Sequence, residues 1–512
     1  MKSDRGAIPA LRPAPGNVRG LLLALMFCVA LLAAALQVPG HVSMDTSMQL
    51  YEAHTGSSVS WSPPFMSAAL RWMGGGTQAT TLFVLACVAM TYGGMALAFP
   101  GVAVAETTSR GRRVVGALLL VLAILNPMIF LYVGIVWKDV LFASLFATAA
   151  GLLLHATAYA GSARGRWLYF IAGLILVPML LVRQQGVVLA PPLFLACLLG
   201  VAGAWQGWFA RRWWLRFFLV LLVYGAAYWQ LERASQLTIA DADGTTGASG
   251  YTFIRKYDIT GLVASGAARG IALPDRLSSD EFQAGVLRAY GDDRIDHVMN
   301  DPAVIAGFRG VDPTEISTVW STLVAARPDA YVSMKARQYA WLLGLHRLDR
   351  CLPIHLGVEG KLDYLAAVGV PPRMDERDRL LFGISLQARH LATHRHWFYL
   401  LLLFAAAAWL VARRKSFSSA ERQAVSALIA GLTLFYASFM VAGLACDFRY
   451  LYPGLIGVTV LFVFLVAHEC LRGRKTDSGC ACLAAACNEC AGYRRCRIHR
   501  LAYDCRASGS RP

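Results

Sequence analysis

Long, unbroken apolar runs dominate the sequence and exclude most folds. An ordinary soluble chain carries about 25% charged residues, whereas this chain of 512 residues is 57% hydrophobic and only 15% charged. Ten runs are long enough, or nearly so, to cross roughly 30 Å of hydrocarbon as helices. They lie near 19–38, 78–99, 114–136, 140–160, 167–182, 187–204, 215–231, 396–412, 424–445 and 452–468. The sequence therefore predicts an all-α polytopic membrane protein and excludes a soluble enzyme, a coiled coil and a disordered chain.

Basic residues beside the short loops predict the orientation, because cytoplasmic loops collect Lys and Arg. Clusters in the N-terminal segment 1–18, in the loops after the even-numbered runs and at the start of the tail all fall on one side. They include Arg110, Arg112, Arg113, Arg164, Arg166, Arg211, Arg212, Arg413, Arg414, Lys415, Arg472 and Arg474. We expect both termini in the cytoplasm. The net charge of +17 fits such loops and indicates no nucleic-acid partner.

The first run is expected to be a retained anchor, because no clear small-residue cleavage site precedes Val38-Pro39. The membrane part then divides into 19–231, with an outer catalytic loop at 39–77, and 396–468. Between them lies a polar insert, 232–395, which is near neutral and predicted to form a mainly helical extracytoplasmic domain. One of its helices is expected over 329–345, where apolar residues recur at helical spacing.

The 12 cysteines do not predict a disulfide framework, because Cys351 is the only one in the insert. Cys28, Cys87, Cys197 and Cys446 lie in or beside apolar runs, where cysteine behaves as a small hydrophobe. The remaining seven fall between Cys470 and Cys505. Their spacing only partly resembles a zinc site, so we interpret 469–512 as a basic, Cys-rich, disordered tail.

Asp45, just after the first run, is the first candidate site residue. A carboxylate held at the membrane surface can act as a general base or bind a divalent metal through oxygen. Alternatively, Asp45 is a solvated loop residue or caps the helix that follows. Lys138 and Asp139 form the second candidate, since an adjacent pair lowers the cost of charge near membrane depth. Otherwise the pair simply marks the end of a run.

Arg183 and Gln184 occupy a very short outer turn, where positive charge is disfavoured. A guanidinium suits a phosphate there, although Arg183 could also extend to lipid headgroups. The last outer loop offers Asp447, Arg449 and Tyr450, either as a site or as an ion pair within an aromatic belt. All these loops face the same side, so together they predict a pocket for a phosphate-bearing, lipid-linked substrate.

These motifs resemble the GT-C superfamily of polytopic glycosyltransferases, which use polyprenyl-phosphate sugars at the outer membrane face. The resemblance lies in Asp45, in Trp61-Ser-Pro-Pro64-Phe65 with its amphipathic helix, and in Asn126-Pro127 with Trp137-Lys138-Asp139. It continues in Arg183-Gln-Gln-Gly186 and Asp447-Phe-Arg-Tyr450, and spans the membrane part of the chain.

The resemblance implies an inverting transfer of a hexosyl or pentosyl unit to a glycan, lipid or protein acceptor. Asp45 would be the catalytic base or orient the acceptor, and Asp139 would be the second acid. Arg183 and Arg449 would hold the donor phosphate, with Lys138, Gln184, Asp447 and Tyr450 also lining the substrate. Many members place a second acid beside the first, whereas Thr46 follows Asp45 here, so metal dependence stays open.

The partners expected are a lipid-linked donor, membrane lipid and the acceptor, in a bacterial inner membrane. A flippase or transporter for a lipid-linked glycan is the alternative, although transporters usually show repeats and charges near mid-membrane. A glycan polymerase is a third interpretation, because it also carries outer Arg residues and a large outer loop.

Overall fold

The computed structural model describes residues 17–60, 62–99, 110–203, 213–240, 249–348, 350–351 and 354–470. In these ranges the chain is helical, and its only β contacts are isolated bridges. The predicted all-α fold class is confirmed. Some predictions lie outside the described residues: those on 1–16 of the N-terminal segment, on Trp61, Arg211 and Arg212, and on the tail beyond Cys470.

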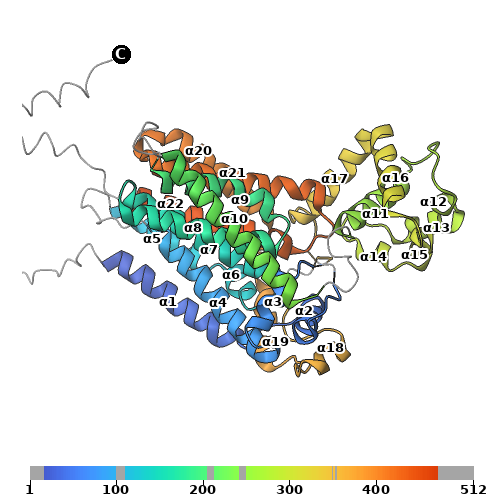
Figure 1. Ribbon diagram of the computed structural model, residues 1–512, viewed down its shortest axis with the longest axis horizontal. Coiled ribbons are helices and arrows are strands. Elements are labelled where there is room, and N and C mark those ends of the chain that lie inside the picture. Colours follow the sequence, from blue (N-terminus) through green and yellow to red (C-terminus); the bar gives the residue numbers. More distant parts are fainter. Residues whose placement is uncertain are drawn as a thin grey trace, which may run out of the picture.

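All ten predicted apolar runs are helical (Figure 1). Eight described helices are long and apolar enough to cross a membrane, and two shorter apolar helices accompany them. In chain order the bundle comprises α1 (Asn17–Gln37), α4 (Gly76–Leu97), α5 (Arg110–Ile124) with α6 (Pro127–Tyr132), α7 (Lys138–Ala156), α8 (Ala163–Val182), α9 (Gly186–Ala202), α10 (Trp213–Thr238), α20 (His396–Ala412), α21 (Ser419–Ala442) and α22 (Tyr452–Cys470). Short 3-10 turns follow or join them: η1 (Thr157–Tyr159), η4 (Arg414–Ser416) and η5 (Phe448–Leu451).

The third run is interrupted where a polar residue caps a new helix. Asn126 accepts a hydrogen bond from the backbone N–H of Met128, and Pro127 occupies the first turn of α6. Asn and Pro are favoured at these two positions because the cap satisfies a free N–H and proline has none to lose. The break lets the chain turn before α7, whose first residues are site candidates.

Helices α7 and α22 form the most buried part of the bundle. Helix α7 meets α4 at a glycine contact, since a Cβ on Gly151 would lie 2.1 Å from the carbonyl oxygen of Gly94. Small residues permit such close backbone approach between helices in a membrane. The outer helix α10 instead exposes large apolar side chains, such as Phe218 and Leu222, as expected of a lipid-facing surface.

One end of the bundle carries the elements that matter for function (right side of Figure 1). Helices α2 (Met44–Thr55) and α3 (Phe65–Trp72), which come between α1 and α4 in the chain, lie at this end. Helix α3 confirms the amphipathic helix predicted in the first loop. Helix α1 begins and α22 ends at the opposite end. The loops that hold the candidate residues are therefore gathered at one end of the bundle.

The insert contains a helical unit with its own core. It comprises α11 (Ser249–Ala264), α12 (Asp275–Ser278), α13 (Asp280–Ala289), α14 (Asp296–Met299), α15 (Pro302–Phe308), α16 (Pro313–Ala326) and α17 (Pro328–Leu342), around side chains that include Phe282 and Leu323. Helix α17 confirms the helix predicted over 329–345. Its buried face includes Lys335, whose ammonium lies 2.5 Å from the Asp258 carboxylate, while Val332 is exposed.

The predicted single insert, 232–395, is divided between two cores. Helix α10 continues through residue 232 to Thr238, and the unit described above follows it. The last part, with α18 (Leu362–Ala367), α19 (Glu376–Ala388) and η3 (Ala392–His394), packs on the bundle instead. Its apolar side chains, Leu356, Leu365 and Leu381 among them, belong to the core of the membrane part.

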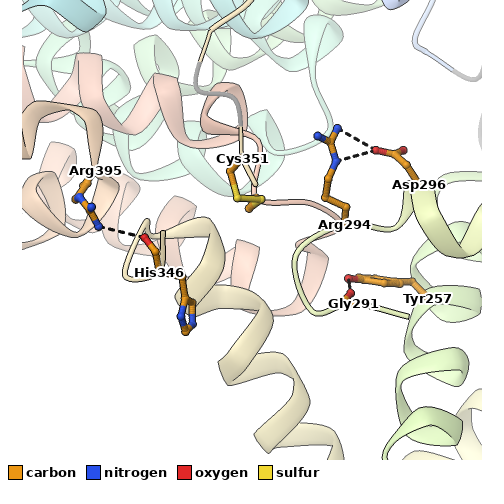
Figure 2. The surroundings of a disulfide bond; sticks show 8 residues. Tyr257, Gly291, Arg294, Asp296, His346, Cys351 and Arg395 are labelled. Atoms are coloured by element: carbon orange, nitrogen blue, oxygen red, sulfur yellow. Dashed lines mark hydrogen bonds and ion pairs between the residues drawn. A yellow bond between two sulfur atoms is a disulfide. The ribbon is translucent and has the colours of Figure 1, made fainter. Parts of the chain in front are cut away.

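One disulfide joins Cys351 to Cys446, a pairing that the sequence did not predict (Figure 2). Cys446 follows α21 in a polar loop and does not pack as a small hydrophobe inside a helix. The two cysteines lie 95 positions apart, and nothing in their local sequence indicates the pairing. The bond ties the insert to the loop that carries Asp447 and Arg449.

Candidate functional site

Asp45 and Arg449 form the first contact of the candidate site. Asp45 lies in the first turn of α2, where the helix dipole favours a carboxylate. Arg449, in η5, donates from Nη1 to Asp45 Oδ2 at 2.5 Å, and its Nε lies 3.2 Å from Asp447 Oδ2. The Asp45 side chain is 49% exposed and that of Arg449 is 17% exposed, so a substrate can reach this pair mainly through the Asp45 carboxylate.

Asp139 and Arg183 form a second pair, which is buried. Asp139 lies in the first turn of α7 and Arg183 follows the last residue of α8, and their side chains are 2% and 7% exposed. Arg183 also donates from Nε to Gln185 Oε1 at 3.0 Å. Two charges this deeply buried are tolerated because each neutralises the other. Gln184, the predicted neighbour, is exposed.

Tyr450 connects the two pairs. The guanidinium carbons of Arg183 and Arg449 lie 5.4 Å and 5.3 Å from its ring centroid. The carbonyl oxygen of Tyr450 lies 3.5 Å from Arg183 Nη1. Both arginines therefore face one aromatic ring, and such contacts stabilise a guanidinium. The four charged residues form one continuous network.

The start of α7 holds the first loop in place. Trp137 donates from Nε1 to Ser43 Oγ at 2.7 Å, just before α2, and its ring lies 4.9 Å from the Arg449 guanidinium. Lys138 donates from Nζ to Ser62 Oγ at 3.0 Å. The predicted Lys138 thus lies beside the network and contacts the first loop. Ser43, Ser62 and the role of Trp137 were not predicted.

Three contacts with residues outside η5 and its loop fix the position of η5. One ring nitrogen of His396, Nε2, is hydrogen-bonded to the carbonyl oxygen of Phe448 at 2.9 Å. The Phe448 ring packs on Tyr132, with centroids 5.3 Å apart. The disulfide at Cys446 holds the preceding loop. Arg449 therefore lies in a segment whose position is fixed by a hydrogen bond, an aromatic contact and a disulfide.

His355, from the insert, also approaches the site and was missed in the sequence. Its Nε2 is hydrogen-bonded to the carbonyl oxygen of Val42 at 2.8 Å, and its ring centroid lies 6.1 Å from that of Trp137. A single histidine in a polar segment carries no motif, so only the fold places it beside α2. It brings the insert to the first loop.

The pKa of the Asp45 carboxyl lies below its ordinary value of 3.8. Burial raises this pKa, but the charges of Arg449 and Lys138 and the hydrogen bond from Arg449 outweigh burial and lower it. Asp45 is therefore ionised at neutral pH while Arg449 is its partner. It can orient a hydroxyl or accept its proton once the arginine is engaged elsewhere.

Carboxylates that could hold a divalent metal are few at this site. Asp45 and Asp447 are the accessible ones, and both contact Arg449. The described residues contain no group of three or more His, Cys, Asp or Glu side chains arranged for a metal ion. A hard cation such as Mg²⁺ often takes one or two carboxylates and completes its shell with substrate phosphate and water.

Comparison with known proteins assigns no family. No protein-family model and no curated protein matches the sequence. One solved structure similar to this chain is the archaeal oligosaccharyltransferase AglB from Archaeoglobus fulgidus, in complex with an inhibitory peptide and a dolichol-phosphate; the TM-score is 0.35 and the identity 12%. The match covers 95% of this chain and 54% of that one, so this chain spans about half its length. Similarity at this level indicates no function for this chain.

Proposed function

We propose that this protein is a membrane glycosyltransferase of the GT-C type, which moves a sugar from a polyprenyl-phosphate donor to an acceptor. The observation that carries the proposal is the pair of the half-exposed Asp45 with Arg449, which Tyr450 connects to the buried Arg183–Asp139 pair. Two guanidinium groups beside an accessible carboxylate match what transfer from a phosphate-linked donor requires, namely anion binding and a base.

In the proposed reaction, Arg449 and Arg183 bind the donor phosphate with their planar guanidinium groups. Because the phosphate then shares the positive charge of Arg449, the pKa of Asp45 rises toward its ordinary value. An acceptor hydroxyl or amine attacks the anomeric carbon, and its proton passes to Asp45. The bond from that carbon to the phosphate oxygen breaks, and the departing polyprenyl phosphate is stabilised by the arginines. A single displacement inverts the configuration.

The proposed orientation places this end of the bundle outside the cytoplasm, with both termini inside, in a bacterial inner membrane. Basic loop residues such as Arg164 and Arg413 support it through the positive-inside rule. The Cys351–Cys446 disulfide also supports it, because disulfides persist on oxidising faces of membranes.

The test compares membranes containing the wild-type chain or Asp45→Asn, each supplied with radiolabelled polyprenyl-phosphate sugars. Label is followed into the lipid, polysaccharide and protein fractions, which identifies the acceptor class. Asp329→Asn is the matched control, because Asp329 is also an exposed acid in the first turn of a helix. We expect transfer by the wild type and the control and its loss in Asp45→Asn at equal protein level.

Two results would count against the proposal. Transfer that Asp45→Asn leaves unchanged would remove Asp45 as the base. No transfer by any variant, together with uptake of the unaltered lipid-linked glycan into vesicles, would favour the transporter. The length distribution of the product separates a single transfer from polymerisation.

A further inference from the structure

The helical unit of the insert contains an open cleft of ligand size that the proposed reaction does not use. Its volume is about 680 Å³, within the range of roughly 300–1,000 Å³ usual for small-molecule sites. Helices α13, α14 and the start of α15 form its walls, together with the segment before Cys351. Its charged and amide side chains are Arg288, Asp293, His297, Asn300, Asp301 and Arg350.

The lining offers hydrogen-bond donors and acceptors in balance. The lining contains two arginines and two aspartates, and Arg288 Nη2 lies 2.6 Å from Asp301 Oδ2 while the Arg288 side chain remains 63% exposed. Asn300 and His297 are exposed as well and add groups that can both donate and accept. A lining without excess charge gives no electrostatic advantage to a polyanion or a polycation. It suits hydroxyl groups, which donate and accept at once.

The cleft is joined to the candidate site by main-chain hydrogen bonds. The carbonyl oxygen of Asp293 accepts from the N–H of Cys446 at 2.8 Å, and that of Leu444 accepts from Ile295 at 2.9 Å. Asp447, which contacts Arg449, follows immediately after Cys446. Figure 2 shows the disulfide beside this junction, near Arg294.

The disulfide adds a second link between the cleft and the site. Arg350 lines the cleft and directly precedes Cys351, the partner of Cys446. One wall of the cleft is therefore continuous with the loop that presents the proposed phosphate-binding arginine. A ligand in the cleft would be held on a unit that is linked to the site and lies outside the membrane-spanning helices.

We propose that this cleft binds a neutral oligosaccharide, the acceptor of the transfer, through sugar residues remote from the reacting end. The inference rests on the proposed function and narrows its acceptor from glycan, lipid or protein to a glycan. The choice of a neutral saccharide as ligand rests on the balanced polar lining of the cleft. The connection of the cleft to the reaction rests on the main-chain hydrogen bonds at Cys446.

The test measures binding to the purified full chain without donor. The probes are maltotetraose, cellotetraose, mannotetraose and chitotetraose, followed by saturation-transfer NMR and calorimetry. Asn300→Ala and Arg350→Ala each remove one exposed cleft side chain, and Arg269→Ala removes an exposed arginine of the same unit outside the cleft. We expect at least one probe to bind and its Kd to rise about tenfold, the effect of roughly one lost hydrogen bond, in both cleft variants but not in the control.

Binding of no probe, or equal binding by wild type and both cleft variants, would overturn the inference. Preferential binding of an acidic tetrasaccharide or of a peptide, if the cleft variants lose that binding, would also overturn it. Because no donor is present, these results are independent of catalysis. Saccharide binding that the cleft variants lose, in a protein that transfers no sugar, would keep the site and remove the glycosyltransferase proposal.

Discussion

Arg449 Nη1 lies 2.5 Å from Asp45 Oδ2, although 404 positions separate the two residues in the chain. The contact joins the helix after the first span to the turn before the last one. It forms only when α1, α7 and α22 are assembled into one bundle. The accessible charge of the site is therefore a product of the whole membrane fold.

This pair predicts how the pH profile responds to mutation. The positive charge of Arg449 holds the pKa of Asp45 below 3.8, so the carboxylate is lost only as the pH falls through a still lower value. In Arg449→Gln that charge and its hydrogen bond are gone, so burial, which raises the pKa, is opposed mainly by the charge of Lys138. We expect the acid limb of kcat/KM, which reports the free enzyme, to move to higher pH in the residual activity of Arg449→Gln.

Arg449→Lys is the control for this prediction, because it keeps the charge and alters only the geometry. Its acid limb should stay with that of the wild type even where activity falls. Transfer is measured from about pH 3 to pH 7 under kcat/KM conditions. An acid limb that stays unchanged in Arg449→Gln would show that Asp45 is not the titrating group.

The buried Asp139–Arg183 pair predicts a different response, one of stability. Removing one partner of a buried ion pair costs about 3–5 kcal/mol, because the other charge is left uncompensated. Asp139→Asn should therefore lower the thermal midpoint and the transfer rate together. The double variant Asp139→Asn/Arg183→Gln should recover most of the stability but not the transfer, because the proposed phosphate ligand is missing.

Intrinsic fluorescence during heating, combined with the transfer assay, separates these two effects. A single Asp139→Asn variant that is as stable as the wild type but inactive would instead make Asp139 a catalytic residue. That outcome would match the role that the resemblance implies for it.

The sequence predicted those features that depend on local residue patterns and on the preference of basic loops for the cytoplasmic side of the membrane. Apolar runs predicted the spans, an amphipathic stretch predicted α3, and helical spacing of apolar residues predicted α17. The grouping of Asp45, Arg183 and Arg449 followed from their loops sharing one side. The sequence pattern did not predict the contacts within that group. Gln185, rather than the predicted Gln184, contacts Arg183, because a shift of one residue at a helix start decides which side chain turns inward.

Long-range contacts were missed for a related reason. His355 and Val42 are 313 positions apart, and Cys351 and Cys446 are 95 apart. A histidine or cysteine in a polar loop has no periodicity that indicates its partner. The division of the insert was also hidden, because short amphipathic helices such as α18 bury an apolar face without specifying which core receives it.

Neighbouring glycines in α4 provide a direct test of the helix packing. A Cβ on Gly94 would lie 2.4 Å from the backbone of Ala147, whereas a Cβ on Gly93 has no atom within 4 Å. Gly94→Ala should therefore force α4 and α7 apart and destabilise the bundle by about 1–3 kcal/mol, as overpacking does. Gly93→Ala should be neutral or slightly stabilising, because alanine favours a helix. Equal thermal midpoints for the two variants would contradict this packing.

The Cys351–Cys446 disulfide predicts coupled losses of stability and transfer. Closing a long loop stabilises a protein by about 2–4 kcal/mol, so the double variant Cys351→Ser/Cys446→Ser should unfold at a lower temperature. Because the bond holds the loop before Arg449, the KM for the donor should also rise. Cys28→Ser is the control, since Cys28 is a free, exposed cysteine in α1. Alkylation of the denatured but unreduced wild type, followed by mass spectrometry, should show Cys351 and Cys446 blocked and Cys28 modified; free thiols at both loop positions would contradict the bond and the oxidising location proposed for this end.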